Sequence, residues 1–401
     1  MHTMFHVSLF IRPFVRRCSA QLARVVWRGC NGLLRGVLSL RALPALLVLG
    51  WLTGCGGSEP QVAPPPVTPE QPVAQHVFQL HGLSGLTVER LYQQQDTILA
   101  LTSAGLYQQH NNSDWQLLGF KGLQPKDLAF VTEQHWLLAL TVQHEDAEQE
   151  HQIHETFDAG RSWTQVKRPF GINGENEAIY AQRYAADAKK LYATGVGVLA
   201  ESSDLGISWR VLDGQWGGFG QPKSALALDP RSGDIWWGGQ GALEDGVLNV
   251  YRRASQRSQS FRDLLPNPSV YYNIRFAMAN GGQSLIYACG EGGIVMSADQ
   301  GSSWRNLLGD VNYRFYFDVV FDSKHNNRLY TAGWDKKFDE PQPLILQWSD
   351  DQGASWQRLQ YQAPASFFGG VRSMLLVQQQ NQTYLYLGLF KGGVMRVSVN
   401  R

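Results

Sequence analysis

A short pattern, Ser/Thr-x-Asp-x-Gly-x-x-Trp, occurs four times in this 401-residue chain. Its Ser, Thr and Asp side chains are of the kind that bond to nearby backbone N–H groups and so fold a turn. The glycine supplies the positive φ angle that such a turn needs, and the tryptophan begins the next segment with a large apolar surface. Each copy therefore predicts a β-hairpin turn followed by a strand. The fixed residues are Thr156, Asp158, Gly160 and Trp163; Ser202, Asp204, Gly206 and Trp209; Ser297, Asp299, Gly301 and Trp304; and Ser349, Asp351, Gly353 and Trp356.

The copies are spaced like structural repeats. Asp158 and Asp204 lie 46 residues apart, and Asp299 and Asp351 lie 52 apart. The interval from Asp204 to Asp299 is 95 residues, about two units, so a degenerate copy is expected at 254–261, where none of the four key residues is kept. A period of 40–50 residues in a β-type sequence is typical of a β-propeller.

Seven strand-like segments line up as the second strands of seven repeats. They are residues 98–101, 137–140, 191–194, 235–238, 286–289, 329–332 and 384–387. The last repeat ends near Ser398 without an outer strand, and the unused segment 77–80 can supply one. The sequence therefore predicts an all-β fold, a seven-bladed propeller over residues 76–401. Pairing of the two termini would close its ring and remove an open sheet edge.

The repeated motif resembles the Asp-box, or bacterial-neuraminidase (BNR) repeat, of sialidases, sortilin-type receptors, some glucanases and photosystem II assembly-factor propellers. This resemblance covers roughly residues 76–401 and implies the propeller fold. It names no substrate, because the motif is a hairpin device in all of these families. The four tryptophans of the motif are accordingly expected to lie in the core rather than to form a sugar-binding set.

The first 54 residues have the layout of a secretion signal. They carry seven arginines and no acidic residue, and the apolar run 42–52 is too short to span a membrane. The ending Leu-Thr-Gly-Cys resembles a bacterial lipobox, which implies a lipid attached to Cys55. The alternative is an ordinary signal peptide that happens to contain a cysteine. A translation start nearer Val37 would give a signal of normal length.

Residues 55–75 are expected to form a lipid-anchored tether. They are rich in Gly and Pro, a composition typical of an extended linker with polyproline character. The predicted location is the bacterial cell envelope. Because Gly56 rather than Asp follows Cys55, the segment resembles lipoproteins sorted to the outer membrane, where the propeller would face the periplasm or the cell surface.

The charge of the chain argues against nucleic-acid binding. The whole sequence has a net charge of +1, but without its first 54 residues it keeps 28 basic and 34 acidic residues, a net charge of −6. Outside the signal segment and Cys55, Cys289 is the remaining cysteine, so no disulfide framework is expected. Its apolar neighbours predict a buried, inert thiol.

Cationic residues recur near the predicted start of the innermost strands. Lys126, Lys223 and Arg275 each precede the end of their second strand by 15 residues, which suggests one shared register. A ring of cations at the mouth of the central channel would attract carboxylates, sulfates or phosphates. In this it resembles, in kind, the arginine patch on one face of the photosystem II assembly propellers. The six residues of this predicted rim are Arg90, Lys126, Lys223, Arg275, Arg314 and Arg372.

These cations have a structural alternative, which is pairing with carboxylates such as Glu89, Asp127 or Glu177. Aromatic connectors at 216–219, 271–272, 313–316 and 367–370 are expected on the same side of the ring. Together, aromatic residues and arginine have the composition of binding hot spots. The alternative is that these aromatic residues simply fill the channel mouth and the seams between blades.

No catalytic residue can be assigned from the sequence. A sialidase needs an arginine cluster, a Tyr/Glu nucleophile pair and an acidic Asp, and the Arg-Ile-Pro signature usual on its first blade is missing. Other glycosidases need two carboxylates at a defined separation, and the sequence cannot pair the candidates. Those candidates are Asp213, Glu244, Asp245, Glu291, Asp310 and Asp318.

An acidic, histidine-rich insertion spans 144–155. Its three histidines and five carboxylates could bind a divalent ion. The spacing His144, His151, His154 matches no closed metal site, so a solvated long hairpin is favoured, as it is for the insertion at 336–341. No metal site and no cofactor is therefore expected.

These features favour a non-catalytic, membrane-anchored binding or assembly scaffold. It would be a monomer that uses its basic and aromatic rim to hold a protein partner or an anionic ligand. The alternative is a glycan-acting enzyme, sialidase-like or another glycoside hydrolase, or a glycan-binding propeller; a third option is a structural component of a larger envelope complex. An enzyme would bring carboxylates with perturbed pKa values together at the channel mouth, whereas a scaffold would place cations and aromatic residues there without such a pair.

Overall fold

The computed structural model describes residues 76–399 apart from 146–147, 173–175, 244, 266–268, 280–281, 309–313, 323, 326 and 380. The predicted signal segment, the lipidation site Cys55 and the tether lie outside the described residues. All 28 elements of the described part are β-strands. The same residues include no helix that is long and apolar enough to cross a membrane.

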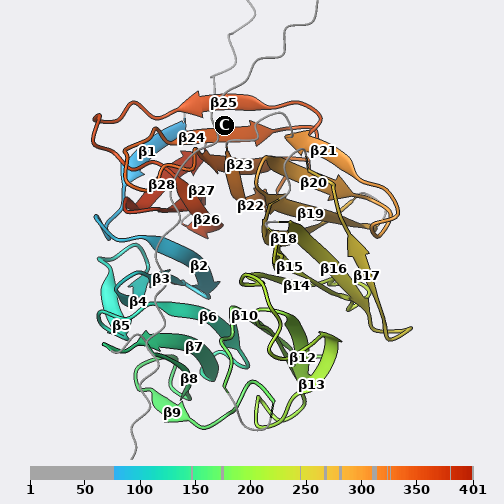
Figure 1. Cartoon of the computed structure of the whole chain (residues 1–401). Helices are drawn as coiled ribbons and strands as arrows, with labels where there is room; N and C mark the ends of the chain where they lie inside the picture. The colour runs from blue at the N-terminus through green and yellow to red at the C-terminus, as the bar shows by residue number, and fades with distance from the viewer. Residues whose placement is uncertain are drawn as a thin grey trace, which may run out of the picture. The chain divides into compact units, whose positions relative to one another are not determined.

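The strands form seven antiparallel sheets of four, which are the blades of a propeller (Figure 1). Blade 1 contains β2 (Val88–Gln94), β3 (Thr97–Thr102), β4 (Gly105–His110) and β5 (Gln116–Gly119). Blade 2 contains β6 (Pro125–Phe130), β7 (Trp136–Gln143), β8 (Gln149–Thr156) and β9 (Thr164–Val166). Blade 3 contains β10 (Ala181–Ala185), β11 (Lys190–Thr194), β12 (Val198–Ser202) and β13 (Arg210–Gly214).

The second half of the ring repeats this order. Blade 4 contains β14 (Ala225–Leu228), β15 (Ile235–Gln240), β16 (Gly246–Arg252) and β17 (Arg257–Phe261). Blade 5 contains β18 (Tyr271–Met278), β19 (Ser284–Gly290), β20 (Gly293–Ser297) and β21 (Arg305–Leu308). Blade 6 contains β22 (Phe315–Phe321), β23 (Leu329–Trp334), β24 (Ile345–Ser349) and β25 (Gln357–Gln360). Blade 7 contains β26 (Val371–Gln379), β27 (Gln382–Leu389), β28 (Gly393–Val399) and β1 (His76–Leu80).

Blade 7 is built from both ends of the described chain. Strand β1 pairs antiparallel with β28, so that His76 lies opposite Val399 and Leu80 lies opposite Met395. This pairing gives the C-terminal blade the outer strand that its own sequence lacks. The predicted seven blades and the predicted closure by the two termini are confirmed.

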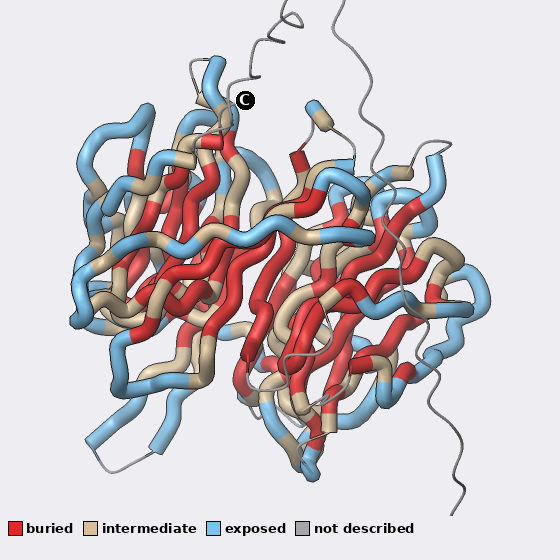
Figure 2. The backbone as a smooth tube through the Cα atoms, turned by 90° about the horizontal axis from the view of Figure 1, so that it is seen from above, coloured by how far each residue is buried: buried red, intermediate tan, exposed pale blue. Residues whose placement is uncertain are grey.

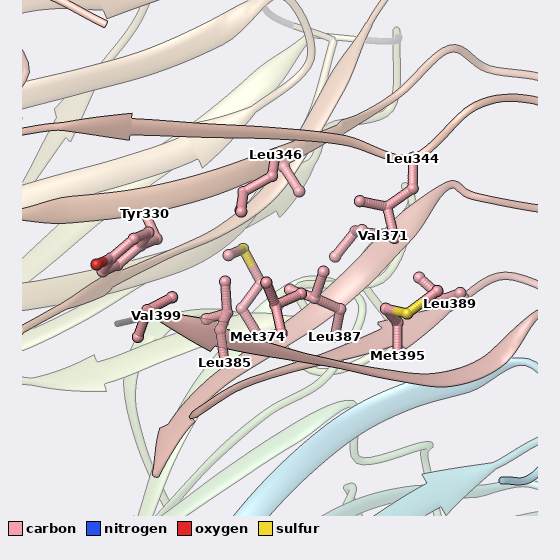
Figure 3. Close-up of a cluster of buried hydrophobic side chains, with 12 residues drawn as sticks. Tyr330, Leu344, Leu346, Val371, Met374, Leu385, Leu387, Leu389, Met395 and Val399 are labelled. Carbon is pink, nitrogen blue, oxygen red and sulfur yellow. The ribbon is translucent and has the colours of Figure 1, made fainter. Parts of the chain in front are cut away.

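The core lies between neighbouring blades, because each sheet is covered on both faces. Buried residues are concentrated in the strands and exposed residues in the connecting loops (Figure 2). At the seam between blades 6 and 7, for example, Tyr330, Leu346, Leu387 and Met395 pack into one apolar cluster (Figure 3). Cys289 is fully buried in β19, and burial raises the pKa of its thiol.

The four copies of the repeated motif lie in the turns between the third and fourth strands of blades 2, 3, 5 and 6, and they share one hydrogen-bond pattern. In blade 3, the Ser202 hydroxyl accepts the N–H of Gly206 at 2.7 Å and donates to the Asp204 carboxylate at 2.7 Å. That carboxylate also accepts the N–H and the hydroxyl of Ser208, at 2.9 and 2.6 Å. Leu205 and Gly206 both have positive φ angles, 57° and 93°. These side-chain hydrogen bonds therefore take the place of backbone–backbone hydrogen bonds across the turn.

These turns also seal the seams between blades. In blade 5, a Cβ atom on Gly301 would lie 2.6 Å from Cζ of Phe261, which belongs to the preceding blade. The four tryptophans of the motif are partly buried, and each packs against the edge of an apolar cluster. The degenerate fourth blade uses Phe261 in the same way, since this ring stacks on Trp236 with centroids 5.4 Å apart.

Candidate functional site

The middle of the ring holds a cavity of about 670 Å³, here called the central pocket. Residues from all seven blades line it, mostly from the innermost strands. Its charged lining residues are Glu89, Arg90, Lys126, Arg183, Arg275 and Arg372. Its aromatic lining residues are Tyr92, Phe130, Tyr180, Tyr184, Tyr272 and Phe317. A cavity of this size suits a small ligand or a short segment of a polymer.

A repeated backbone irregularity aims side chains into this pocket. Five innermost strands shift register against their second strand near their first residues. A bulge leaves one residue unpaired and redirects its side chain. Five residues inside these shifts line the central pocket: Glu89, Lys126, Tyr272, Phe317 and Arg372.

Directly after the bulge in β6, Asp127 forms a buried hub. Its Oδ2 accepts the backbone N–H of Gln182 and the guanidinium of Arg183, both at 2.7 Å. Its Oδ1 accepts the hydroxyl of Tyr92 and lies 3.6 Å from Nε of Arg90. Burial alone would raise the pKa of Asp127, but the charges of Arg183 and Arg90 outweigh burial and bring this pKa below its ordinary value. The ionised carboxylate therefore fixes two arginines at the wall of the pocket.

Asp318 forms a second hub on the opposite side of the ring. It accepts two parallel hydrogen bonds of 2.8 Å from Nε and Nη2 of Arg275. It also accepts the side-chain amide of Asn273 at 3.0 Å and the backbone N–H of Met374 at 3.2 Å. The Asp318 side chain is 1% exposed, whereas that of Arg275 keeps 40% of its surface exposed. The two-pronged pair therefore holds Arg275 rigidly and leaves part of it facing the cavity.

The pocket carries an excess of positive charge. Five of its lining side chains are cationic and one, Glu89, is a carboxylate. Glu89 pairs with Arg372 at 2.7 Å. The buried carboxylates of Asp127 and Asp318, which do not line the pocket, balance two further positive charges. Lys126 forms no ion pair with any residue that the structure describes, and burial lowers the pKa of its ammonium group against the opposing effect of Glu89. The five cations thus exceed the three nearby carboxylates by two.

Aromatic rings complete one wall. Tyr272 stacks on Phe317 with centroids 3.9 Å apart. The guanidinium carbon of Arg372 lies 4.7 Å from the Phe317 centroid and 5.5 Å from that of Trp334. Arg372 is therefore held both by a carboxylate and by cation–π contacts.

The structure places the six predicted rim cations in different environments. Arg90, Lys126, Arg275 and Arg372 line the central pocket. The predicted common register is wrong, because Lys126 lies in a bulge, Arg275 lies within β18 opposite Tyr287, and Lys223 precedes β14. The 15-residue count assumed hairpin turns of constant length, and they vary between blades.

Lys223 and Arg314 are not among the pocket-lining residues. Lys223 is 5% exposed, and its Nζ donates to the backbone carbonyls of Val196, Gln221 and Gln240 at 2.9, 2.9 and 2.6 Å. Arg314 is 6% exposed and its Nε donates to Asp335 at 2.5 Å. The placement of these two cations on an open rim was therefore wrong, and both brace connecting loops.

Sequence reasoning missed Arg183. The predicted rim contains no cation from blade 3, and Glu177, which was named as a possible partner of the rim cations, accepts the N–H of Gly217 at 2.6 Å. Arg183 lies opposite Tyr192 in β11, just as Arg275 lies opposite Tyr287 in β19. Counting along the sequence could not have found it, because Arg275 lies 12 residues before Tyr287 whereas Arg183 lies nine residues before Tyr192.

The candidate carboxylates do not gather in the pocket. Glu244 and Asp310 lie outside the described residues. Asp213 accepts the indole N–H of Trp237, Asp245 pairs with Arg262, Glu291 pairs with Lys336, and Asp318 pairs with Arg275. None of these four lines the central pocket.

The histidine-rich insertion forms the β7–β8 hairpin. His151 contacts the Thr141 hydroxyl at 3.0 Å, and His144 lies 3.2 Å from Glu150. Among the described residues, which omit 146–147 of this hairpin, no group of three or more His, Cys, Asp or Glu side chains is placed to hold a metal ion.

The fold is similar to that of GH74 enzymes. A GH74 xyloglucanase from Xanthomonas campestris superposes with a TM-score of 0.59 and 15% identity, over 81% of this chain and 54% of that one. An ancestral GH74 enzyme superposes with a TM-score of 0.60 and 12% identity, over 79% and 48%. This chain thus spans about half the length of either enzyme, and at such identity the likeness shows the fold alone. The sequence matches no protein-family model and no curated protein.

Proposed function

We propose that this propeller is a non-catalytic binding protein whose central pocket holds an anionic group of a ligand or of a partner protein. The observation that carries the proposal is the charge of the pocket, with five cationic side chains and one carboxylate among the described lining residues. Buried carboxylates already hold the arginines in place, so little side-chain ordering remains to oppose binding. The aromatic wall offers flat apolar contact beside the charge.

Lys126 offers the cleanest test. It lines the pocket without an ion pair to any described residue, so Lys126→Gln removes one charge and leaves no carboxylate stranded. By contrast, replacing Arg275 would leave Asp318 buried and unpaired, which is strongly destabilising. The matched control is Lys121→Gln, at an exposed position in the loop before β6.

The measurement is titration calorimetry with sulfate, phosphate and glucuronate at low ionic strength. We expect at least one anion to bind, about tenfold more weakly to Lys126→Gln than to the native protein, and equally to Lys121→Gln. Added salt should weaken binding through screening. Absence of binding for all three anions, or equal binding by both variants, would contradict the proposal.

The second candidate is a glycan-acting enzyme, and the likeness of the fold to two GH74 enzymes favours it. Hydrolysis of this kind uses two carboxylates, and Glu89 is the carboxylate among the described lining residues. The test is release of reducing ends from xyloglucan and from acidic polysaccharides. Hydrolysis by the native protein that is lost in Glu89→Gln would support this candidate and overturn the non-catalytic one.

We further propose that the protein is a monomeric lipoprotein of the bacterial cell envelope, anchored through Cys55. The Leu-Thr-Gly-Cys ending before the Gly- and Pro-rich segment supports this. Metabolic labelling with a fatty acid should mark the native protein and leave Cys55→Ser unlabelled. Equal labelling of the two would reject the anchor, and light scattering of the detergent-solubilised protein would test the monomer.

A further inference from the structure

A second cavity lies at the seam where the ring closes. It has a volume of about 420 Å³ and is here called the seam pocket. Its lining includes Gln93 and Asp96 of blade 1 and Gln378, Tyr384 and Arg396 of blade 7. Gln93 and Gln378 lie near the last residues of β2 and β26. The bulges that direct side chains into the central pocket lie near the first residues of these strands. The two cavities therefore belong to opposite ends of the innermost strands.

The lining of the seam pocket combines an apolar floor with a rim of planar polar groups. Ile98 and Val377 are buried below it, and the Tyr384 ring is half-buried. Glutamine and asparagine side chains each carry a donor and an acceptor in one plane, which matches neighbouring hydroxyl groups on a ring. Apolar and aromatic surface matches the C–H face of the same ring. One cation and one carboxylate, Arg396 and Asp96, leave the lining without net charge.

The rim is fixed before any ligand arrives. Arg396 donates to Gln79 of β1 at 2.5 Å and to Asn112 of blade 1, and its guanidinium lies 4.7 Å from the Tyr384 centroid. Asn111 and Asn112 both adopt left-handed backbone, with φ angles of 46° and 63°. The Asn111 N–H donates to the Asp96 carbonyl at 3.1 Å and closes this turn. Asparagine tolerates this conformation in tight turns, so the turn holds both asparagines in place at the rim.

We propose that the seam pocket binds a short neutral saccharide of about two rings. The absence of net charge in its described lining distinguishes it from the central pocket, and its volume lies within the range of small-molecule sites. Because blades 1 and 7 both contribute, a bound saccharide braces the joint that closes the ring. Binding is therefore expected to stabilise the native fold. This inference does not depend on anion binding in the central pocket.

The test is titration of the full chain with cellobiose, maltose and chitobiose, followed by calorimetry and by thermal unfolding. We expect at least one disaccharide to bind with a Kd of about 1 mM or tighter and to raise the unfolding temperature. Gln93→Ala and Gln378→Ala, both at exposed positions, should each weaken binding by roughly fivefold. Gln116→Ala, on the outer strand β5, is the matched control and should bind normally.

Three results would overturn the proposal. One is failure of every neutral disaccharide to bind at about 10 mM. Another is unchanged affinity in both Gln93→Ala and Gln378→Ala. The third is loss of saccharide binding in Lys126→Gln, which would place the ligand in the central pocket instead. Anion binding by the Gln93 and Gln378 variants, measured in parallel, separates failure of this proposal from failure of the one for the central pocket.

Discussion

Asp127 and Asp318 have the same relation to their neighbours, although they lie in blades 2 and 6. Each accepts a backbone N–H from the next blade and holds an arginine of the preceding blade. Each is almost completely removed from water. A buried carboxylate in this position both joins three blades and orients the cations of the central pocket.

The first prediction concerns Asp127→Asn. The amide would leave Arg183 and Arg90 without their buried counter-charge, and breaking a buried pair from one side costs about 3–5 kcal/mol. Urea unfolding at neutral pH should report this loss. Glu89→Gln, which removes the partly exposed partner of Arg372, should cost about 1 kcal/mol or less. Similar losses in the two variants would contradict the assigned role of Asp127.

The second prediction concerns acid stability. Hydrogen bonds, first from Ser202 and then from Ser208, lower the pKa of Asp204 from 3.8 to about 2. The Ser355 hydroxyl and N–H do the same for Asp351, whose pKa is also about 2. A lowered pKa contributes stability that is complete above the ordinary pKa and is lost as pH falls toward the folded-state value. We therefore expect the stability gap between the native protein and Asp204→Asn/Asp351→Asn to be constant above about pH 5 and to shrink as the pH falls from about 5 to 2. A gap that does not change with pH in urea titrations would reject this role of the two carboxylates.

At the scale of the element, the turns of the repeated motif could be predicted from sequence because their logic is local. Ser202 and Asp204 act within a few residues, so the pattern alone specifies the turn. The bulges could not be predicted, because a register shift of one residue leaves no mark in composition and yet exchanges the two faces of a strand. Arg183 was missed for a different reason, because its strand has no bulge and fewer residues separate it from Tyr192 than separate Arg275 from Tyr287. The sequence also predicted Lys223 on an open rim, whereas its buried ammonium group donates hydrogen bonds to three backbone carbonyls.

The third prediction concerns Gly301 in the turn of blade 5. Its φ is 88°, and an added Cβ would lie 2.6 Å from Phe261 of blade 4. Gly122 has a similar φ of 76°, but no atom lies within 4 Å of the Cβ that a substitution would add there. Gly122→Ala should therefore cost about 1–2 kcal/mol from backbone strain alone. Gly301→Ala should cost about 1–3 kcal/mol more, because the added methyl group would overpack the seam between blades 4 and 5. Equal losses in thermal unfolding would show that this turn does not seal the seam.

At the scale of the whole molecule, the ring has one joint at which its strands are not consecutive in sequence. Blade 7 depends on β1, and Phe78 of that strand packs against the apolar cluster shared by blades 6 and 7. The number of blades and the closure could be predicted because both follow from counting strands. The pockets at the centre and at the joint could not, because each combines side chains from blades far apart in the chain.

The fourth prediction compares a chain that starts at His76 with one that starts at His81. The shorter chain loses β1, which exposes the edge of β28 and removes Phe78 from its cluster. We expect the free energy of unfolding to fall by roughly 3 kcal/mol or more. The exposed edge should also promote self-association, visible by light scattering. Equal stability and equal mass of the two chains would show that the ring does not need its N-terminal strand.

The pairing of His76 with Val399 also sets the order in which the molecule can be completed. When the chain emerges with its N-terminus first, β1 is among the first strands to appear, and its partner β28 is among the last. Blades 1 to 6 can form one after another, since each draws its strands from one continuous stretch. During all that time β1 stays unpaired, with an apolar sequence open to the strands of other nascent chains. Exchange of this one strand between two chains would yield a dimer with every native contact preserved. A high local concentration of incomplete chains is therefore the condition under which this fold is most exposed to error.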